Sequence, residues 1–315
     1  MKIERRSFLK GLAALPIVSA CGDTAETNLP AAAPVADLKI LTQSWGTSLL
    51  IGKIAELLLR EQLAVTAASV PTLEANIWDA LAAGTAHACL EVWPLRNGVG
   101  VRRFVDSGKV AVVGDLGVGR SAFFVPEYLV DKVPEITKPT TSALLAELVG
   151  KAQVTELLVG PGDWITPTPA RMSALGLGSL PVRAEATEKS FLAAIETGFA
   201  NRQPFMASLW YPHPIHSRYP LMAVGLPAAN GCDVKAEVYG CDYPAETILK
   251  VAAPGLEFTN PSVFKFLQSY APPLDDMVAL LASSSDAPEV LARNWIKSKN
   301  VVWSPWINAA KSVTK

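Results

Sequence analysis

The chain has 315 residues, of which 50% are hydrophobic and 18% charged, so it can bury large cores and is not expected to be disordered. Its formal net charge of −1 gives no overall basic field, whereas phosphate binding relies on clustered Lys and Arg, and nucleic acid is therefore not an expected partner. The chain has eight tryptophans, and tryptophan is the side chain best suited to wide flat contacts and to cation–π attraction.

Residues 1–20 have the pattern of an export signal. Basic side chains precede a short apolar segment at Gly11 to Val18, which is too short for a membrane-spanning helix of about 20 apolar residues. The run R-R-S-F-L-K resembles a twin-arginine signal, and V-S-A-C, ending at Cys21, resembles a lipobox, in which the cysteine is lipidated. The alternative is an ordinary signal peptide. Residues 21–37 are predicted to tether a periplasmic or cell-surface lipoprotein to a membrane.

The first part of the remaining chain alternates between strand and helix patterns. Strands are expected at Leu38–Leu41, Val65–Val70, Ala86–Val92 and Val110–Val113, and helices at Ser48–Leu63, at 72–83 with Thr72 as its cap, and near Val99–Asp106. This alternation predicts a sheet of the parallel type that is covered by helices.

A second alternation of the same kind follows. Strands are expected at Ser121–Val125, Thr155–Val159, Pro181–Ala184 and Pro204–Leu209, and helices at Thr141–Val149, Pro169–Leu175 and Glu188–Phe199. A strand at Thr247–Ala252 and helices at Pro261–Tyr270, Asp275–Leu281 and Ala287–Lys297 complete the pattern. The chain is therefore predicted to have an α/β fold with two units.

The eight tryptophans divide into two groups. Three of the four candidate site residues share one position, the point where the chain turns after an apolar strand; the four are Trp45, Trp93, Trp164 and Trp210. Ligands of open α/β sheets bind outside the carboxyl ends of strands, so this position favours a binding site. The other four are expected to pack in cores, namely Trp78, Trp295, Trp303 and Trp306.

The stretch Ala207–Tyr219 contains two of the three histidines of the chain. Pro212 and Pro214 favour a stiff, irregular backbone that presents Trp210 at the end of a strand. His213 and His216 have the i, i+3 spacing of a metal pair, but the prolines oppose a regular helix and no third ligand is evident. No metal site and no cofactor are therefore predicted.

The cysteines beyond Cys21 have two predicted roles. Cys232 and Cys241 flank a short loop that contains glycine, and export to an oxidising compartment favours a disulfide between them. Cys89 lies in an apolar strand pattern and is expected to be a small buried side chain.

Four motifs in order along the chain carry a resemblance to a known family. They are Q-S-W-G-T at 43–47, A-L-A-A-G at 80–84 leading to E-V-W-P, G-P-G-D-W at 160–164 and W-Y-P-H at 210–213. P-P-L-D-D-M at 272–277 and A-R-N-W-I at 292–296 extend the likeness into the tail. On these motifs the chain resembles the substrate-binding lipoproteins of bacterial ABC importers for glycine betaine, choline and related quaternary amines.

The resemblance implies a two-lobed type II periplasmic binding protein fold with crossing hinge strands. Lobe 1 would comprise residues 38–120 and 244–315, and lobe 2 residues 121–243. The ligand would be caught between the lobes by closure about the hinge. The implied partners are an ABC permease and an ATPase, and the protein itself is expected to act as a monomer.

The resemblance also implies an aromatic cage. A quaternary ammonium has no N–H to donate, whereas aromatic faces attract both its methyl groups and its diffuse charge. The family's cage positions match Trp93, Trp164 and Trp210, with Trp45 as a further wall in choline-type members. Core packing between the lobes is the alternative for these four rings.

The residues around the cage suggest which ligand it takes. Backbone N–H groups near Gly46 and Thr47 could bind a ligand carboxylate, and His213 could add a side-chain hydrogen bond. Choline-type members have an Asp at the position of Thr47, so the resemblance favours a betaine over choline. The alternatives are choline or another small methylated cation, namely carnitine, dimethylsulfoniopropionate or trimethylamine N-oxide. Pro214 replaces the family's usual Trp and leaves the orientation of His213 open. Glu91 either adds negative potential or lies in a solvated ion pair.

Two other classes of function compete with an importer's binding protein. A lipid-anchored hydrolase could use His213 or His216 as its base, but the sequence has no G-x-S-x-G, no H-E-x-x-H and no cysteine beside such a base. A ligand-sensing module without a transporter is the second alternative. Solute binding without catalysis is the prediction.

Overall fold

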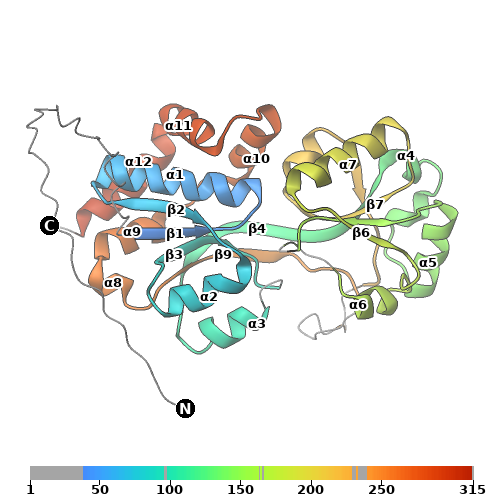
Figure 1. The fold of residues 1–315 in the computed structure, drawn as a ribbon, viewed down its shortest axis with the longest axis horizontal. Helices are drawn as coiled ribbons and strands as arrows, with labels where there is room; N and C mark the ends of the chain where they lie inside the picture. Colours follow the sequence, from blue (N-terminus) through green and yellow to red (C-terminus); the bar gives the residue numbers. More distant parts are fainter. Residues whose placement is uncertain are drawn as a thin grey trace, which may run out of the picture. The chain divides into compact units, whose positions relative to one another are not determined.

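The structure is a computed structural model that describes residues 38–95, 98–162, 164, 167–228, 232 and 240–313. The predicted export signal, the lipobox at Cys21 and the tether lie outside these residues. Figure 1 shows the described chain as two groups of strands with helices on their faces. Each group has its own parallel strands, as the βα alternation predicted.

The first group contains three parallel strands in the order β2-β1-β3. They are β1 (Leu38–Thr42), β2 (Ala67–Pro71) and β3 (Ala88–Val92). The strand β9 (Glu246–Ala252) runs antiparallel to β3 and joins this group from the far end of the chain. The parallel pattern is therefore confirmed for β1 to β3 but does not extend to β9.

The second group contains three parallel strands in the order β7-β5-β6. They are β5 (Leu157–Val159), β6 (Val182–Ala184) and β7 (Met206–Tyr211). The short strand β8 (Leu221–Ala223), which no sequence pattern predicted, pairs with β4. We call the first group with its helices lobe 1 and the second group with its helices lobe 2; the exact boundaries stay a prediction.

A single strand, β4 (Ala111–Pro126), belongs to both lobes. It pairs with β9 as far as Gly119 and with β7 from Arg120 onward, so one continuous strand crosses from lobe 1 to lobe 2 (Figure 1). The prediction of two separate strands in this region was wrong. Gly114 and Gly117 have positive φ angles of 140° and 123° and accommodate register shifts within the strand.

Helices cover both lobes. They are α1 (Gly46–Leu63), α2 (Glu74–Ala82), α3 (Gly98–Gly100), α4 (Glu127–Val130), α5 (Ser142–Lys151), α6 (Pro169–Ala174), α7 (Glu188–Ala200), α8 (Leu256–Thr259), α9 (Pro261–Ser269), α10 (Leu274–Ser283), α11 (Pro288–Ser298) and α12 (Asn300–Ser312), with shorter helical turns at Val101–Val105, Pro134–Thr137 and Pro214–Ser217. The predicted cap Thr72 was wrong: α2 begins after Leu73, and the Thr72 hydroxyl donates to the Val70 carbonyl. Within the described ranges, no helix has the length and apolar character needed to cross a membrane.

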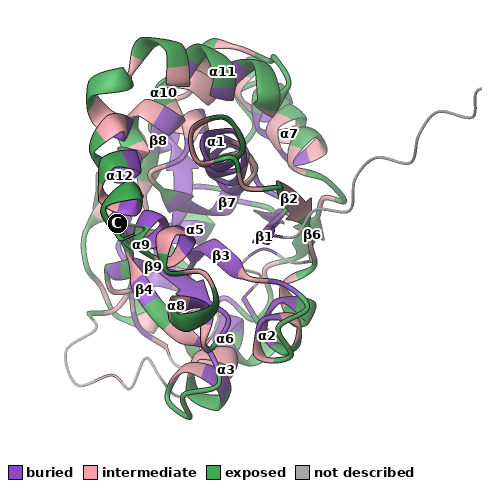
Figure 2. Cartoon of the chain, turned by 90° about the vertical axis from the view of Figure 1, so that its left-hand side faces the viewer, coloured by how far each residue is buried: buried purple, intermediate pink, exposed green. Residues whose placement is uncertain are grey.

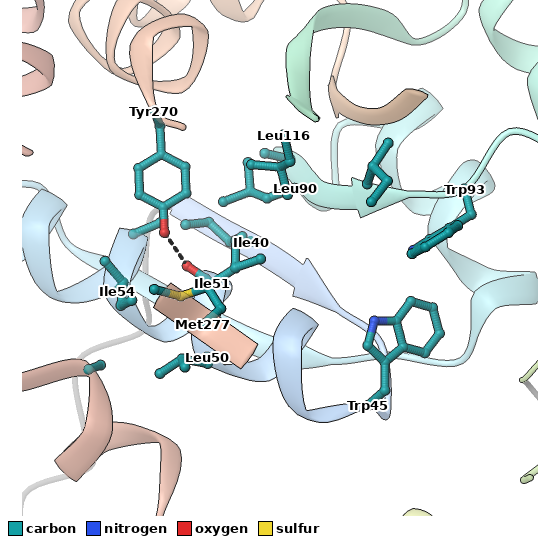
Figure 3. Close-up of a cluster of buried hydrophobic side chains, with 14 of the residues drawn as sticks. Ile40, Trp45, Leu50, Ile51, Ile54, Leu90, Trp93, Leu116, Tyr270 and Met277 are labelled. Atoms are coloured by element: carbon teal, nitrogen blue, oxygen red, sulfur yellow. Dashed lines mark hydrogen bonds between the residues drawn. The ribbon is translucent and has the colours of Figure 1, made fainter. Parts of the chain in front are cut away.

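The buried side chains fill the space between sheet and helices. Figure 2 shows buried residues along β3 and β9 and exposed residues on α10 and α11. In the cluster of Figure 3, the Tyr270 hydroxyl donates to the Ile51 carbonyl of α1 at 2.6 Å. The four tryptophans predicted to lie in cores are buried, which confirms that prediction; they are Trp78, Trp295, Trp303 and Trp306.

The cysteine predictions are also confirmed. Cys232 and Cys241 form a disulfide. Cys89 is a free and fully buried thiol in β3, and burial raises its pKa to about 12.

Lys250 is an unusual buried cation in β9. Its ammonium group donates to the carbonyl groups of Leu267, Gln268 and Tyr270, at 2.9, 3.1 and 2.5 Å, where α9 ends. Burial lowers the pKa of Lys250 to about 8, so the side chain is still charged at neutral pH. Gly114 gives this side chain its room, because a Cβ there would lie 3.0 Å from the Lys250 Cε. Lys250 therefore ties the shared sheet to the end of α9.

We expect Lys250→Met to lower the free energy of unfolding by about 2 kcal/mol or more, because three carbonyl groups lose their buried donor. Urea denaturation measures this change. Lys265→Met, on the exposed side of α9, is the control and should change the free energy by no more than about 0.5 kcal/mol. Equal unfolding midpoints for the two variants would contradict the role given to Lys250.

Candidate functional site

The four candidate tryptophans gather where the two lobes meet. Trp210 is central: its ring centroid lies 4.7 Å from that of Trp164, 5.8 Å from Trp45 and 6.3 Å from Trp93. The three rings are inclined to Trp210 by 75°, 60° and 62°. All four side chains are at most 5% exposed. The structure thus brings the predicted rings into one cluster, which we call the tryptophan cluster.

Strand ends place the rings of the tryptophan cluster. Trp45 follows β1 and stands directly before α1, and Trp93 follows β3 (Figure 3). Trp164 lies in the turn after β5, and Trp210 pairs with Ser121 of β4 near the end of β7. Trp45 and Trp93 come from lobe 1 and the other two from lobe 2, so the cluster needs both lobes.

Two glycines allow the close approach of the rings. A Cβ at Gly119 of β4 would overlap the six-membered ring of Trp93, and a Cβ at Gly160 would overlap the ring of Trp164. Neither glycine has a positive φ. Both positions therefore require glycine for space and not for backbone conformation.

Glu91 anchors the two rings of lobe 1. Its Oε1 accepts hydrogen bonds from the indole N–H of Trp45 at 2.7 Å, from that of Trp93 at 3.1 Å and from the Thr47 hydroxyl at 3.1 Å. The residue is only 2% exposed, so a solvated ion pair was the wrong alternative for it. Charge-assisted hydrogen bonds of this kind fix the orientation of both rings and place a carboxylate beside them.

A further hydrogen bond joins the lobes at the tryptophan cluster. The indole N–H of Trp164, in lobe 2, donates to the Ser44 hydroxyl in lobe 1 at 3.3 Å. Trp164 also packs edge-on against Phe191 of α7, with 5.3 Å between ring centroids. Its ring is therefore held from both sides.

His213 lies beside Trp210, with 4.8 Å between ring centroids. It precedes the helical turn that begins at Pro214, and its Nδ1 accepts the backbone N–H of Ile215 at 3.1 Å. That bond places the ring proton of the neutral histidine on Nε2. The turn that Pro214 starts thus orients His213 toward the tryptophan cluster.

His216 has a structural role. Its Nε2 lies 3.1 Å from the Trp210 carbonyl, which can only accept, so this nitrogen carries the proton. Burial lowers the pKa of His216 to about 4 and keeps the ring neutral. Across the described part of the chain, no group of three or more metal-ligating side chains occurs.

One predicted anion donor at the start of α1, the backbone N–H of Gly46, already has a partner, and so has the side chain of Thr47. The backbone N–H of Gly46 donates to Glu188 Oε2 at 3.0 Å, and the Thr47 hydroxyl donates to Glu91. The other oxygen of Glu188 lies 3.4 Å from His213 Nε2. Sequence reasoning missed Glu188, because the only local indication was an acidic residue in the first turn of a predicted helix.

Three solved structures with similar folds have low sequence identity to this chain. Lactococcal OpuAC, in a closed form complexed with glycine betaine, matches with a TM-score of 0.68 and 16% identity over 86% of this chain and 98% of its own. ProX of Borrelia burgdorferi, a glycine betaine and L-proline transporter's binding protein, matches with a TM-score of 0.66 and 15% identity over 87% and 99%. A choline-binding ABC transporter protein in complex with choline matches with a TM-score of 0.68 and 14% identity, over 88% of this chain and 98% of its own.

These likenesses and the shared strand β4 define the fold as a two-lobed α/β fold. The family model for the substrate-binding domain of the ABC-type glycine betaine transport system matches residues 36–298. The chain belongs to this family. The family consists of substrate-binding transport proteins and not of enzymes, and such a domain acts outside the cytoplasm.

We expect Gly119→Ala to destabilise the protein by about 1–3 kcal/mol and to change its near-ultraviolet circular dichroism, because the new methyl group must displace the ring of Trp93. Gly150→Ala is the matched control. A Cβ there meets nothing within 4 Å, and alanine favours the helix α5. A Gly119→Ala protein with the stability and spectrum of wild type would show that Trp93 does not depend on this glycine.

Proposed function

We propose that this protein is the solute-binding component of an ABC importer and that it binds a small quaternary ammonium compound between its lobes. The observation that carries this proposal is the tryptophan cluster, in which rings from both lobes meet at steep angles around Trp210. Family membership supports the same class of ligand. A permease and an ATPase are the proposed partners.

The chemistry of the tryptophan cluster suits such a cation. Each well-placed ring face contributes roughly 0.5–2 kcal/mol to the binding of a cation, and several rings together can reach micromolar affinity if the site is dry and preorganised. The buried Glu91 adds negative charge, and its hydrogen bonds to the N–H groups of Trp45 and Trp93 polarise both rings in the favourable direction. These features support a trimethylammonium group as the part that the rings recognise.

The far end of the ligand is the part that the sequence left open between betaines and choline. In the sequence, Thr47 stands in place of the acid of choline-type members, and this was the ground for expecting a betaine of the glycine betaine type. The solved structures described above include a complex with glycine betaine and another with choline. Both ligands carry the same trimethylammonium head, so both fit the proposed role of the rings.

Binding without catalysis is part of the proposal. A hydrolase would need a histidine whose accepting nitrogen faces a substrate. In His213 that nitrogen already accepts the Ile215 N–H, and burial lowers the pKa of His216 to about 4, which makes its ring a weak base. This geometry favours a binding protein over the lipid-anchored hydrolase.

Export and anchoring complete the proposed role. The twin-arginine and lipobox motifs support a lipoprotein held to a membrane through Cys21, with residues 38–120 and 244–315 as one lobe and 121–243 as the other. We propose that the protein works as a monomer, since each lobe contributes its own part of one site.

Titration of the purified protein with a panel of small cations tests the function. The panel comprises glycine betaine, proline betaine, choline, carnitine, dimethylsulfoniopropionate and trimethylamine N-oxide, and binding is followed by tryptophan fluorescence. We expect at least one compound to bind well below millimolar concentration, and no compound to be turned over. If none binds more tightly than about 1 mM, which corresponds to about −4 kcal/mol, the proposal fails.

We expect Trp210→Ala to weaken the binding of the preferred ligand by at least about 1 kcal/mol, because the central ring of the tryptophan cluster is lost. Calorimetric titration measures the change. Tyr211→Ala is the control. Tyr211 is the next residue of β7, and its side chain is 60% exposed on the opposite side of the strand from Trp210. Wild-type affinity in the Trp210→Ala protein would remove this ring from the site.

A further inference from the structure

Glu188 of lobe 2 reaches across to the start of α1 in lobe 1. Its Oε2 accepts the backbone N–H of Gly46 at 3.0 Å, and its Oε1 lies 3.4 Å from His213 Nε2. The side chain is 24% exposed, whereas that of His213 is 2% exposed. A carboxylate that belongs to the chain itself thus stands at the edge of the tryptophan cluster.

The two groups that face Glu188 are the donors that a ligand carboxylate would need. The N–H of Gly46 lies at the positive end of α1, an 18-residue helix. His213 carries its proton on Nε2, because Nδ1 accepts the Ile215 N–H, and this buried Nε2 makes no hydrogen bond within the described residues. Glu188 satisfies the first donor and lies within ion-pair distance of the second.

We propose that Glu188 is a specificity-determining residue, which takes the place of a ligand carboxylate and selects a quaternary ammonium compound that carries no carboxylate and ends in a hydroxyl group. This inference rests on the proposed function, because it assigns the far end of the same ligand. It also reverses the preference for a betaine that Thr47 suggested. Glu188 places an acidic side chain of lobe 2 beside Gly46, the neighbour of Thr47.

Charge and hydrogen bonding both favour a ligand with a hydroxyl group over one with a carboxylate. A ligand carboxylate next to Glu188 would place two like charges side by side at the edge of the buried tryptophan cluster, which disfavours binding. A hydroxyl group can donate to a Glu188 oxygen, and the net positive charge of such a ligand is attracted by Glu188 and by the buried Glu91. The site therefore favours a donor at the far end of the ligand and opposes an anion there.

The test compares choline, which has a terminal hydroxyl, with glycine betaine, which has a terminal carboxylate. Both are titrated calorimetrically into the wild-type protein and into Glu188→Gln. We expect wild type to bind choline at least tenfold more tightly than glycine betaine. In Glu188→Gln the preference should fall at least tenfold, because the amide keeps the size of the side chain and removes its charge.

Glu196→Gln is the matched control, since Glu196 lies on the exposed side of the same helix, α7; it should leave the preference unchanged. A wild-type protein that binds glycine betaine as tightly as choline or more tightly overturns the role of Glu188 and leaves the proposed function standing. An unchanged preference in Glu188→Gln overturns it as well. If neither ligand binds below millimolar concentration, the proposed function fails and this inference fails with it. The wild-type comparison decides the question even if Glu188→Gln does not fold.

Discussion

One buried carboxylate oxygen organises the lobe 1 half of the site. Glu91 Oε1 accepts hydrogen bonds from two indole N–H groups and one hydroxyl group, and a buried charge of this kind is tolerated only with such donors. The donors come from the loop before α1 and from the end of β3, so the bonds also tie these two segments together. Trp45 and Trp93 consequently have fixed orientations that do not depend on the ligand.

The strand β4 positions one ring from each lobe. Gly119 leaves room for the ring of Trp93, and Ser121, two residues later, pairs with Trp210. Three consecutive residues of one strand therefore set the relation between a ring of lobe 1 and a ring of lobe 2. A hinge placed at the site itself can bring the lobes together without moving these two rings far apart, which favours preorganisation of the tryptophan cluster.

The predictability of this structure depends on how local each feature is. Strand ends and helix patterns are local, and they placed three of the four candidate tryptophans where the chain turns after a strand, while the family resemblance grouped Trp45, Trp93, Trp164 and Trp210 as cage positions. The continuity of β4 was not predictable, because its glycines have the same local pattern as a turn. Only pairing with β9, which lies more than 100 residues away, shows that they accommodate a bent strand.

Glu188 was missed for the same reason, because its partner Gly46 lies 142 residues away. Glu91 was noticed, since it lies two residues before Trp93 on the same side of β3, but its burial depends on Trp45 and Thr47 from another strand end. Patterns along the chain therefore identified the rings, while the charges that orient them became visible only in the folded structure.

The two carboxylates beside the tryptophan cluster have different physical roles. Glu91 is buried, belongs to lobe 1 and is bound to rings of its own lobe, so it is part of a preformed surface. Glu188 is partly exposed and belongs to lobe 2, and its hydrogen bond to Gly46 forms only when the lobes are together. The bond from Trp164 to Ser44 has the same dependence on closure. The hydrogen bonds of Glu91 therefore belong to one lobe, whereas the contacts of Glu188 with Gly46 and of Trp164 with Ser44 couple the two lobes.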